Sequence, residues 1–268
     1  FMCYFISDKG RKFFRHFRRI MITGRKSKGG KMINKKFREG LWLLNKTIQA
    51  SLFWTPVSEK FIKYADTNDI IRLLRGKGEG IQDKIIKTDK AHNPLTFYKT
   101  LFDILDLKNG VNYIKLWHVD DYNNIFYKSK SKKNDIISEI EKMELLIIIR
   151  RDDPGKNDID SRKDPPKESF TYGKSKFVLD STVLRSTDKK HFTSYVTLNK
   201  KEYAFEGGAY RRMRKFKWKK RLTEGKKRKW TFGTPNRESM PSVPQVGHRL
   251  TNEFDFNNGY QINFYYKV

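Results

Sequence analysis

Residues 211–230 carry the clearest chemical pattern in this chain. The segment reads RRMRKFKWKKRLTEGKKRKW, in which arginine and lysine are interleaved with aromatic residues. Cations at this density can neutralise phosphates, and exposed aromatic rings can stack on bases. The K-F-K-W-K alternation also fits a strand whose Phe216 and Trp218 point inward while the cations face solvent. Both interpretations can hold together, and RNA, DNA and an acidic protein all stay open as the partner.

A second cationic segment lies near the start of the chain. Its centre, RKFFRHFRRIMI, places Phe13, Phe14, Phe17 and Met21 near one face of a helix, and GRKSKGGK follows as a flexible stretch. This pattern is typical of an amphipathic helix with a linker, or of an arm that docks on nucleic acid or an acidic neighbour. The candidate polyanion- or partner-binding residues of the two segments are Arg11, Arg15, Arg18, Arg19, Arg211, Arg212, Arg214, Lys215, Lys217, Lys219, Lys220, Arg221, Lys227 and Arg228.

The composition restricts the function classes. With 58 lysines and arginines against 30 acidic residues, the net charge is +28, and self-repulsion at this charge destabilises an isolated compact state. We therefore expect a polyanionic partner or a neutralising assembly. No apolar run approaches the roughly 20 residues that span a bilayer, and no signal peptide is visible. The single cysteine excludes an internal disulfide and a cysteine-rich zinc site, and the histidines lack metal-ligand spacing, so no cofactor or metal is expected.

The hydrophobic pattern places helices first and strands after, which predicts an α+β fold. Helices are expected within residues 40–64, ending or kinking at Pro56, and over residues 69–74 and 94–107. The continuous apolar run at residues 143–151 is typical of a strand buried on both faces. A mobile charged loop is expected at about residues 152–169. Residues 177–186, 191–198 and 201–207 alternate as antiparallel strands with a tight turn at 199–201, and residues 259–268 form a last strand.

Five segments in chain order resemble the ubiquitin-specific protease family, which has a papain-like fold. They are NKTIQASLFWTP (45–56), NPLTFYKTLFDIL (93–105), LLIIIRR (145–151), the strand, loop and histidine box at 177–196, and GYQINFY (259–265). The resemblance covers most of residues 40–268. It implies a helical N-terminal half, an antiparallel-sheet C-terminal half and a thiolate enzyme that cuts isopeptide bonds.

The departures from the family pattern remove the chemistry. Trp42 stands at the position of the nucleophilic cysteine, and the chain's only cysteine is Cys3. His191 matches the family's histidine, and Glu206 matches the residue that orients it. Without a thiol, residual hydrolysis would be negligible, so these three positions are interpreted as vestigial and His191 as a strand histidine. The zinc-binding CxxC pairs are absent, so the fingers are expected to be lost or reduced to strands near residues 111–127.

The sequence therefore predicts a basic N-terminal arm at residues 1–38 and an inactive protease-like domain at 39–268. The expected role is a structural part of a large assembly, with other protein subunits and nucleic acid as candidate partners. Residues 203–219 are similar to protease-like proteins of large DNA viruses, so a minor capsid or other virion protein is the first choice. The alternatives are a mitochondrial or cytoplasmic ribonucleoprotein component that binds rRNA, a ubiquitin-binding pseudoenzyme and an active deubiquitinase. Ubiquitin is not the expected partner.

Overall fold

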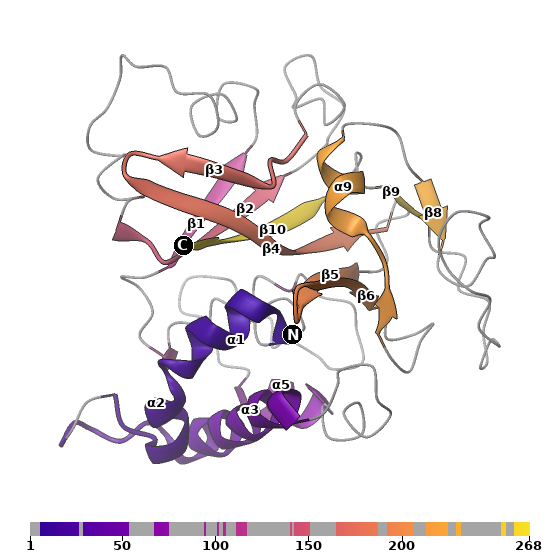
Figure 1. Ribbon diagram of the computed structural model, residues 1–268. Helices are drawn as coiled ribbons and strands as arrows, with labels where there is room; N and C mark the ends of the chain where they lie inside the picture. The colour runs from indigo at the N-terminus through magenta and orange to yellow at the C-terminus, as the bar shows by residue number, and fades with distance from the viewer. Residues whose placement is uncertain are drawn as a thin grey trace. The chain divides into compact units, whose positions relative to one another are not determined.

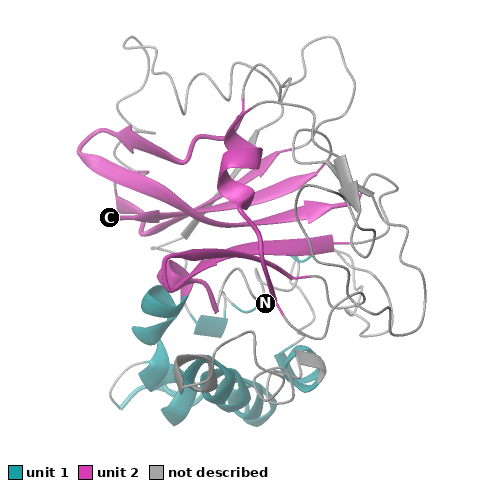
Figure 2. Cartoon of the chain, turned by 45° about the vertical axis from the view of Figure 1, so that its right-hand side comes forward, with its two compact units in different colours: residues 1, 11–109 teal, residues 2–10, 110–268 magenta. Residues whose placement is uncertain are grey.

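The computed structural model describes residues 6–26, 29–53, 67–74, 94, 101, 104–105, 111–116, 140, 142–150, 165–186, 192–205, 213–224, 229–231, 253–255 and 260–268. The chain forms two compact units (Figure 2). The first comprises Phe1 and Arg11–Asn109 and is helical in its described part. The second comprises Met2–Gly10 and Gly110–Val268 and contains the described strands.

The N-terminal segment forms two short helices, α1 (Asp8–Arg15) and α2 (Arg18–Thr23), where the sequence predicts one. The chain turns at His16 and Phe17 between them. Phe14 and Met21 are buried as their spacing predicts. Helix α2 ends at Gly24, whose φ of 65° lies in the left-handed region that ends many helices.

Helix α3 (Lys35–Phe53) packs against α5 (Thr67–Leu74) within the helical unit (Figure 1). Asn34 accepts a hydrogen bond from the Lys36 N–H at 3.0 Å through its side chain, as an N-terminal cap does. Gly40 permits the close approach, because a Cβ there would lie 2.7 Å from Leu74. Helix α3 is described as far as Phe53, so the predicted end or kink at Pro56 lies outside the described residues, and α5 contains the predicted helix at 69–74.

Most of the predicted helix at 94–107 lies outside the described residues. Pro94, Leu101, Ile104 and Leu105 are helical, and Leu101 and Leu105 are buried.

Eight of the described strands form one sheet in the second unit, in the order β1-β2-β10-β4-β5-β6-β7 with β3 paired to β4 (Figure 1). The strands are β1 (Val111–Leu116), β2 (Leu145–Arg150), β3 (Ser169–Tyr172), β4 (Ser175–Arg185), β5 (Phe192–Leu198), β6 (Lys201–Phe205), β7 (Arg214–Lys215) and β10 (Gln261–Lys267). A separate described ladder joins β8 (Lys229–Thr231) to β9 (Glu253–Asp255).

The pairings confirm the predicted α+β class and add one feature. Strand pairs from β2 through β10, β4, β5 and β6 to β7 are antiparallel. Strand β1, by contrast, is parallel to β2 and belongs to the main sheet, which alternation alone did not predict. Strand β2 is buried along its whole length, as its apolar run predicts. The last strand, β10, lies between β2 and β4, so the chain end completes the centre of the sheet.

One face of this sheet carries an aromatic core. Phe177, Tyr195, Trp218 and Tyr265 are essentially without solvent exposure and belong to one cluster. Helix α9 (Trp218–Thr223) contributes to that cluster through Trp218 and Leu222. The aromatic residues thus supply the packing that the low aliphatic content of the chain does not.

Candidate functional site: a basic face on the sheet unit

Of the three positions that the family resemblance marks as vestigial, Trp42 alone lies among the described residues. Trp42 lies on α3, where its side chain is 45% exposed, and the Lys46 ammonium lies 4.1 Å from the centroid of its ring. His191, Glu206 and Cys3 lie outside the described residues. Trp42 is therefore an exposed surface residue stacked on a cation, which is a common arrangement on a helix at i and i+4.

The basic segment folds differently from the strand that its alternation suggests. Strand β7 ends at Lys215, and the chain then enters α9. Phe216 and Trp218 are nonetheless buried, at 4% and 0% exposure, so the predicted inward direction of the aromatic side chains is confirmed. The single-strand prediction is wrong because the pairing with β6 stops at the bond from the Phe216 N–H to the Glu202 carbonyl, and the Glu202 carboxylate then accepts the Lys219 N–H in the first turn of α9.

The buried position of these rings settles one of the two sequence interpretations. The Trp218 indole N–H donates to the Val196 carbonyl at 3.2 Å within the core. The ring of Phe216 lies 6.0 Å from that of Tyr195. Neither ring is accessible to a base, so base stacking on Phe216 and Trp218 is excluded. The side chain of Trp230 lies outside the description.

The cations of this segment surround the buried anchors. Lys215, Lys217 and Lys220 are exposed, whereas Arg214, Lys219 and Arg221 are half-buried. Lys220 pairs with Glu224 at 3.5 Å and Lys219 with Glu168 at 3.9 Å, and the Arg221 guanidinium lies 4.8 Å from the ring centre of Phe216. Arg211, Arg212, Lys227 and Arg228 lie outside the described residues.

The N-terminal cations belong to helices and a folded loop. Arg15, Arg18 and Arg19 are exposed on α1 and α2, and Arg11 is half-buried. Arg19 donates to the Lys26 carbonyl at 3.0 Å, which ties α2 to the basic loop that follows it. Arg25 donates to the Gly30 carbonyl at 3.0 Å in the same loop. The described part of the predicted flexible stretch is thus organised by its own arginines.

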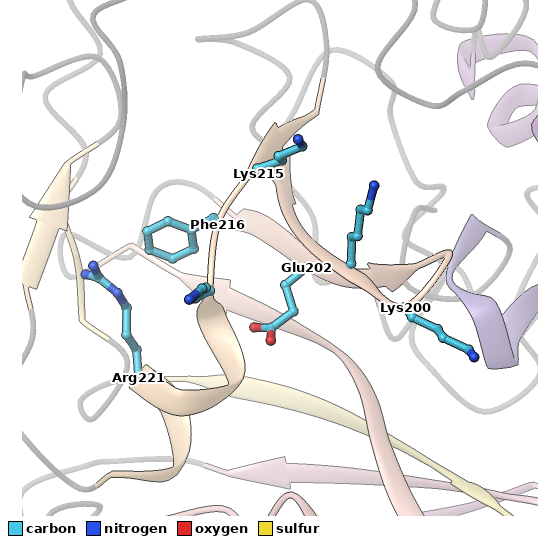
Figure 3. Close-up of a pocket in the computed structure, with 7 residues that line it drawn as sticks. Lys200, Glu202, Lys215, Phe216 and Arg221 are labelled. Carbon is cyan, nitrogen blue, oxygen red and sulfur yellow. The ribbon is translucent and has the colours of Figure 1, made fainter.

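A pocket of about 460 Å³ lies between the β5–β6 turn, β7 and α9 (Figure 3). Five of its described lining residues are cationic, one is acidic and one is aromatic: Lys200, Lys201, Lys215, Lys217, Arg221, Glu202 and Phe216. We call the five cations the basic face. The Glu202 carboxylate accepts a hydrogen bond from the Lys219 N–H at 2.9 Å, so it satisfies a backbone donor in the first turn of α9.

The turn that carries two of these lysines is held by a residue far away in the sequence. Asn199 and Lys200 have φ values of 49° and 60°, the left-handed pair that a tight hairpin requires. The two carboxylate oxygens of Asp8 accept the N–H groups of Asn199 and Lys200, at 2.7 and 2.9 Å. This confirms the predicted turn and supplies the contacts that stabilise it.

A second contact anchors the same N-terminal segment. The register between β10 and β4 shifts between Phe264 and Tyr265, which leaves Asp180 without a partner on β10. Asp180 is buried and accepts the Lys9 N–H at 3.1 Å. Burial raises the pKa of the Asp180 carboxyl to about 6, while hydrogen bonds from Ser7 and Lys9 oppose the shift.

Sequence reasoning found the cations of α9 and missed those of the turn. Lys200 and Lys201 sit in a predicted hairpin turn next to a predicted strand, so the hairpin register could have placed them beside Lys215. Asp8 and Asp180 carry no local signal, because their partners lie 191 and 171 residues away.

No cluster of His, Cys, Asp or Glu able to hold a metal ion occurs within the described part of the chain. Among the same residues, no helix is both long and apolar enough to cross a membrane.

No protein-family model matches the chain, and no curated protein matches it. Among solved structures it is similar to one described as the crystal structure of an essential yeast splicing factor, with a TM-score of 0.38 and 12% sequence identity. That match covers 100% of this chain and 70% of the other. A TM-score this low assigns neither fold nor function.

Proposed function

We propose that the chain is a non-catalytic, protease-like structural protein of a large assembly, bound to a polyanionic partner through its basic surfaces. The single thiol, Cys3, stands far in the sequence from the position that the family resemblance assigns to the nucleophile, and Trp42 occupies that position. An indole cannot attack a carbonyl, and the family's reaction requires a thiolate. A structural role accounts for retention of the protease-like segments without the chemistry.

The observation that carries the proposal is the arrangement of residues 213–224. Met213, Phe216, Trp218 and Leu222 are buried, while Lys215, Lys217 and Lys220 between them are exposed. The cations are therefore displayed from a packed base rather than from a free tail. A rigid display loses less conformational entropy when a partner binds, so more of the electrostatic attraction contributes to affinity.

Two experiments test the two halves of the proposal. Incubation of the full chain with a ubiquitin-based suicide probe should give no covalent adduct. An adduct that disappears in the Cys3→Ser variant would show an active deubiquitinase and overturn the non-catalytic half.

The structural half is tested by what co-purifies with the chain from its native particle at low salt. Major capsid protein would identify a virion component, and ribosomal RNA would identify a ribonucleoprotein component. Isolation as a free monomer, with no retention on heparin near 50 mM salt, would contradict an assembly role.

A further inference from the structure

The pocket lined by the five cations of the basic face is the candidate binding site for the polyanion. We propose, resting on the function above, that this pocket binds the sugar-phosphate backbone of a nucleic acid without regard to base sequence. The five cations come from the β5–β6 turn and β6, from β7 and its following residues, and from α9. Two short stretches of chain, residues 200–201 and 215–221, thus bring positive charge to one cavity.

The charge of the pocket is unbalanced. Five cations against the single carboxylate of Glu202 leave a formal charge of 5 − 1 = +4 on its described lining. The Glu202 carboxylate accepts a hydrogen bond from the backbone N–H of Lys219, so it stabilises the first turn of α9. Among the described residues, no acidic side chain forms an ion pair with Lys200, Lys201, Lys215 or Lys217. Their ammonium groups are available to phosphates.

The directions of the side chains favour an extended ligand over a small anion. In Figure 3, Lys200 and Arg221 extend on opposite sides of Glu202, and Lys215 extends away from both. Donors that hold one small anion converge on it. Cations that spread along a surface match the successive phosphates of a nucleic-acid strand, whose charges repeat at short intervals.

Sequence-independent recognition follows from the burial of Phe216, the one aromatic side chain among the described residues that line the pocket. Phe216 is 4% exposed and lies beneath the Arg221 guanidinium. It therefore offers no face for a base. Lysine ammonium groups bind phosphate oxygens as point charges and carry no base information.

The β5–β6 turn, which lies at one end of the pocket, is stabilised by hydrogen bonds within the protein itself. The Asp8 carboxylate bonds both N–H groups of the turn, and Asp180 holds the adjoining Lys9 N–H. Lys200 and Lys201 are therefore presented on a fixed backbone.

The test is fluorescence anisotropy of a labelled mixed-sequence oligonucleotide of about 20 nucleotides with the full chain, between about 50 and 200 mM salt. The variant replaces Lys200, Lys201, Lys215 and Lys217 by alanine. The matched control replaces four exposed lysines elsewhere, Lys35, Lys36, Lys142 and Lys176. Both variants remove the same charge from solvent-exposed positions.

Each lost phosphate contact lowers the slope of log affinity against log salt by about 0.7–0.9. We expect the face variant to lose about 3 in slope and at least about tenfold in affinity near 100 mM salt, and the control to lose far less. Oligonucleotides of different base composition should bind the unmodified chain within about threefold.

The failures are distinguishable. Equal losses in the two variants would overturn the pocket as the site and leave the proposed function intact. Binding of polyglutamate without binding of the oligonucleotide would overturn the nucleic-acid assignment in favour of an acidic protein partner. Tight saturation by inorganic phosphate alone, with no preference for the polymer, would overturn the extended ligand. Absence of binding to any polyanion would overturn the proposed function as well.

Discussion

Replacement of Asp8 isolates the contribution of one long-range contact to the basic face. Asp8 lies at the start of α1, and its two oxygens accept the N–H groups of Asn199 and Lys200. Asp8→Asn keeps the shape but turns one oxygen into an N–H₂ donor that faces a backbone donor. One hydrogen bond is then lost, and the other loses its charge.

The size of the effect follows from the geometry. Charge-assisted hydrogen bonds contribute about 1.5–3 kcal/mol, and partial solvent exposure reduces this to about 1–2 kcal/mol for the substitution. Asn199 and Lys200 hold left-handed φ values that cost L-residues about 1–2 kcal/mol each. The turn should therefore open locally before the sheet unfolds, and about 1–2 kcal/mol corresponds to roughly 5- to 30-fold faster local opening.

Hydrogen exchange of the two turn amides measures this opening directly. We expect faster exchange at Asn199 and Lys200 in Asp8→Asn and little change in the β3–β4 turn at Gly173. Asp69→Asn is the control, because it removes the same charge from an exposed ion pair with Arg72 on α5. Simple electrostatics predicts tighter nucleic-acid binding when Asp8 loses its charge. Positioning of Lys200 predicts weaker binding, so unchanged exchange together with tighter binding would refute the reasoning.

Two further predictions concern burial. The pKa of Asp180 is raised from 3.8 to about 6 in the folded state, so the stability gained by its protonation is complete below about pH 3.8 and is lost as pH rises through about 6. This stability amounts to about 3 kcal/mol. The Asp180→Asn variant should show a smaller change of the urea-unfolding midpoint between about pH 4 and 7.5 than the unmodified chain. An equal pH dependence in the two proteins would contradict the assignment. Trp218→Ala should lower the free energy of unfolding by about 3–5 kcal/mol, because the fully buried indole fills the core and bonds the Val196 carbonyl. The exposed Trp42→Ala should cost less than about 1 kcal/mol, and equal losses in urea unfolding would show that Trp218 is not a core residue.

Much of the architecture could be predicted because it rests on local periodicity. The run LLIIIR is apolar on both faces and forms the fully buried β2. The alternating pattern predicted β4, β5 and β6 as antiparallel strands, and the residues between the last two predicted their turn. Spacing also identified Phe14 and Met21 as buried residues of the N-terminal helices.

The predictions that failed concern positions where local and long-range preferences compete. The K-F-K-W-K alternation reads as a strand over its whole length. The bond from the Lys219 N–H to the Glu202 carboxylate, and the packing of Trp218 beside Tyr195, stabilise α9 instead. Likewise, apolar alternation around Val111–Leu116 predicts a strand but does not predict which strand it pairs with. Its parallel pairing with β2 is determined by contacts in the assembled sheet.

The sequence by itself determined the excess of positive charge, the position of the single thiol at Cys3 and the alternation of cationic and aromatic residues at 215–219. These properties depend on residue type and short-range spacing. Only the tertiary structure decided which cations share a surface. Lys200 and Lys201 line the same pocket as Lys215, Lys217 and Arg221 because β7 pairs with β6 and leads directly into α9. Asp8 contacts the turn although 191 residues separate it from Asn199, because a hydrogen bond depends on the distance between its atoms in space. A local sequence pattern does not contain that information.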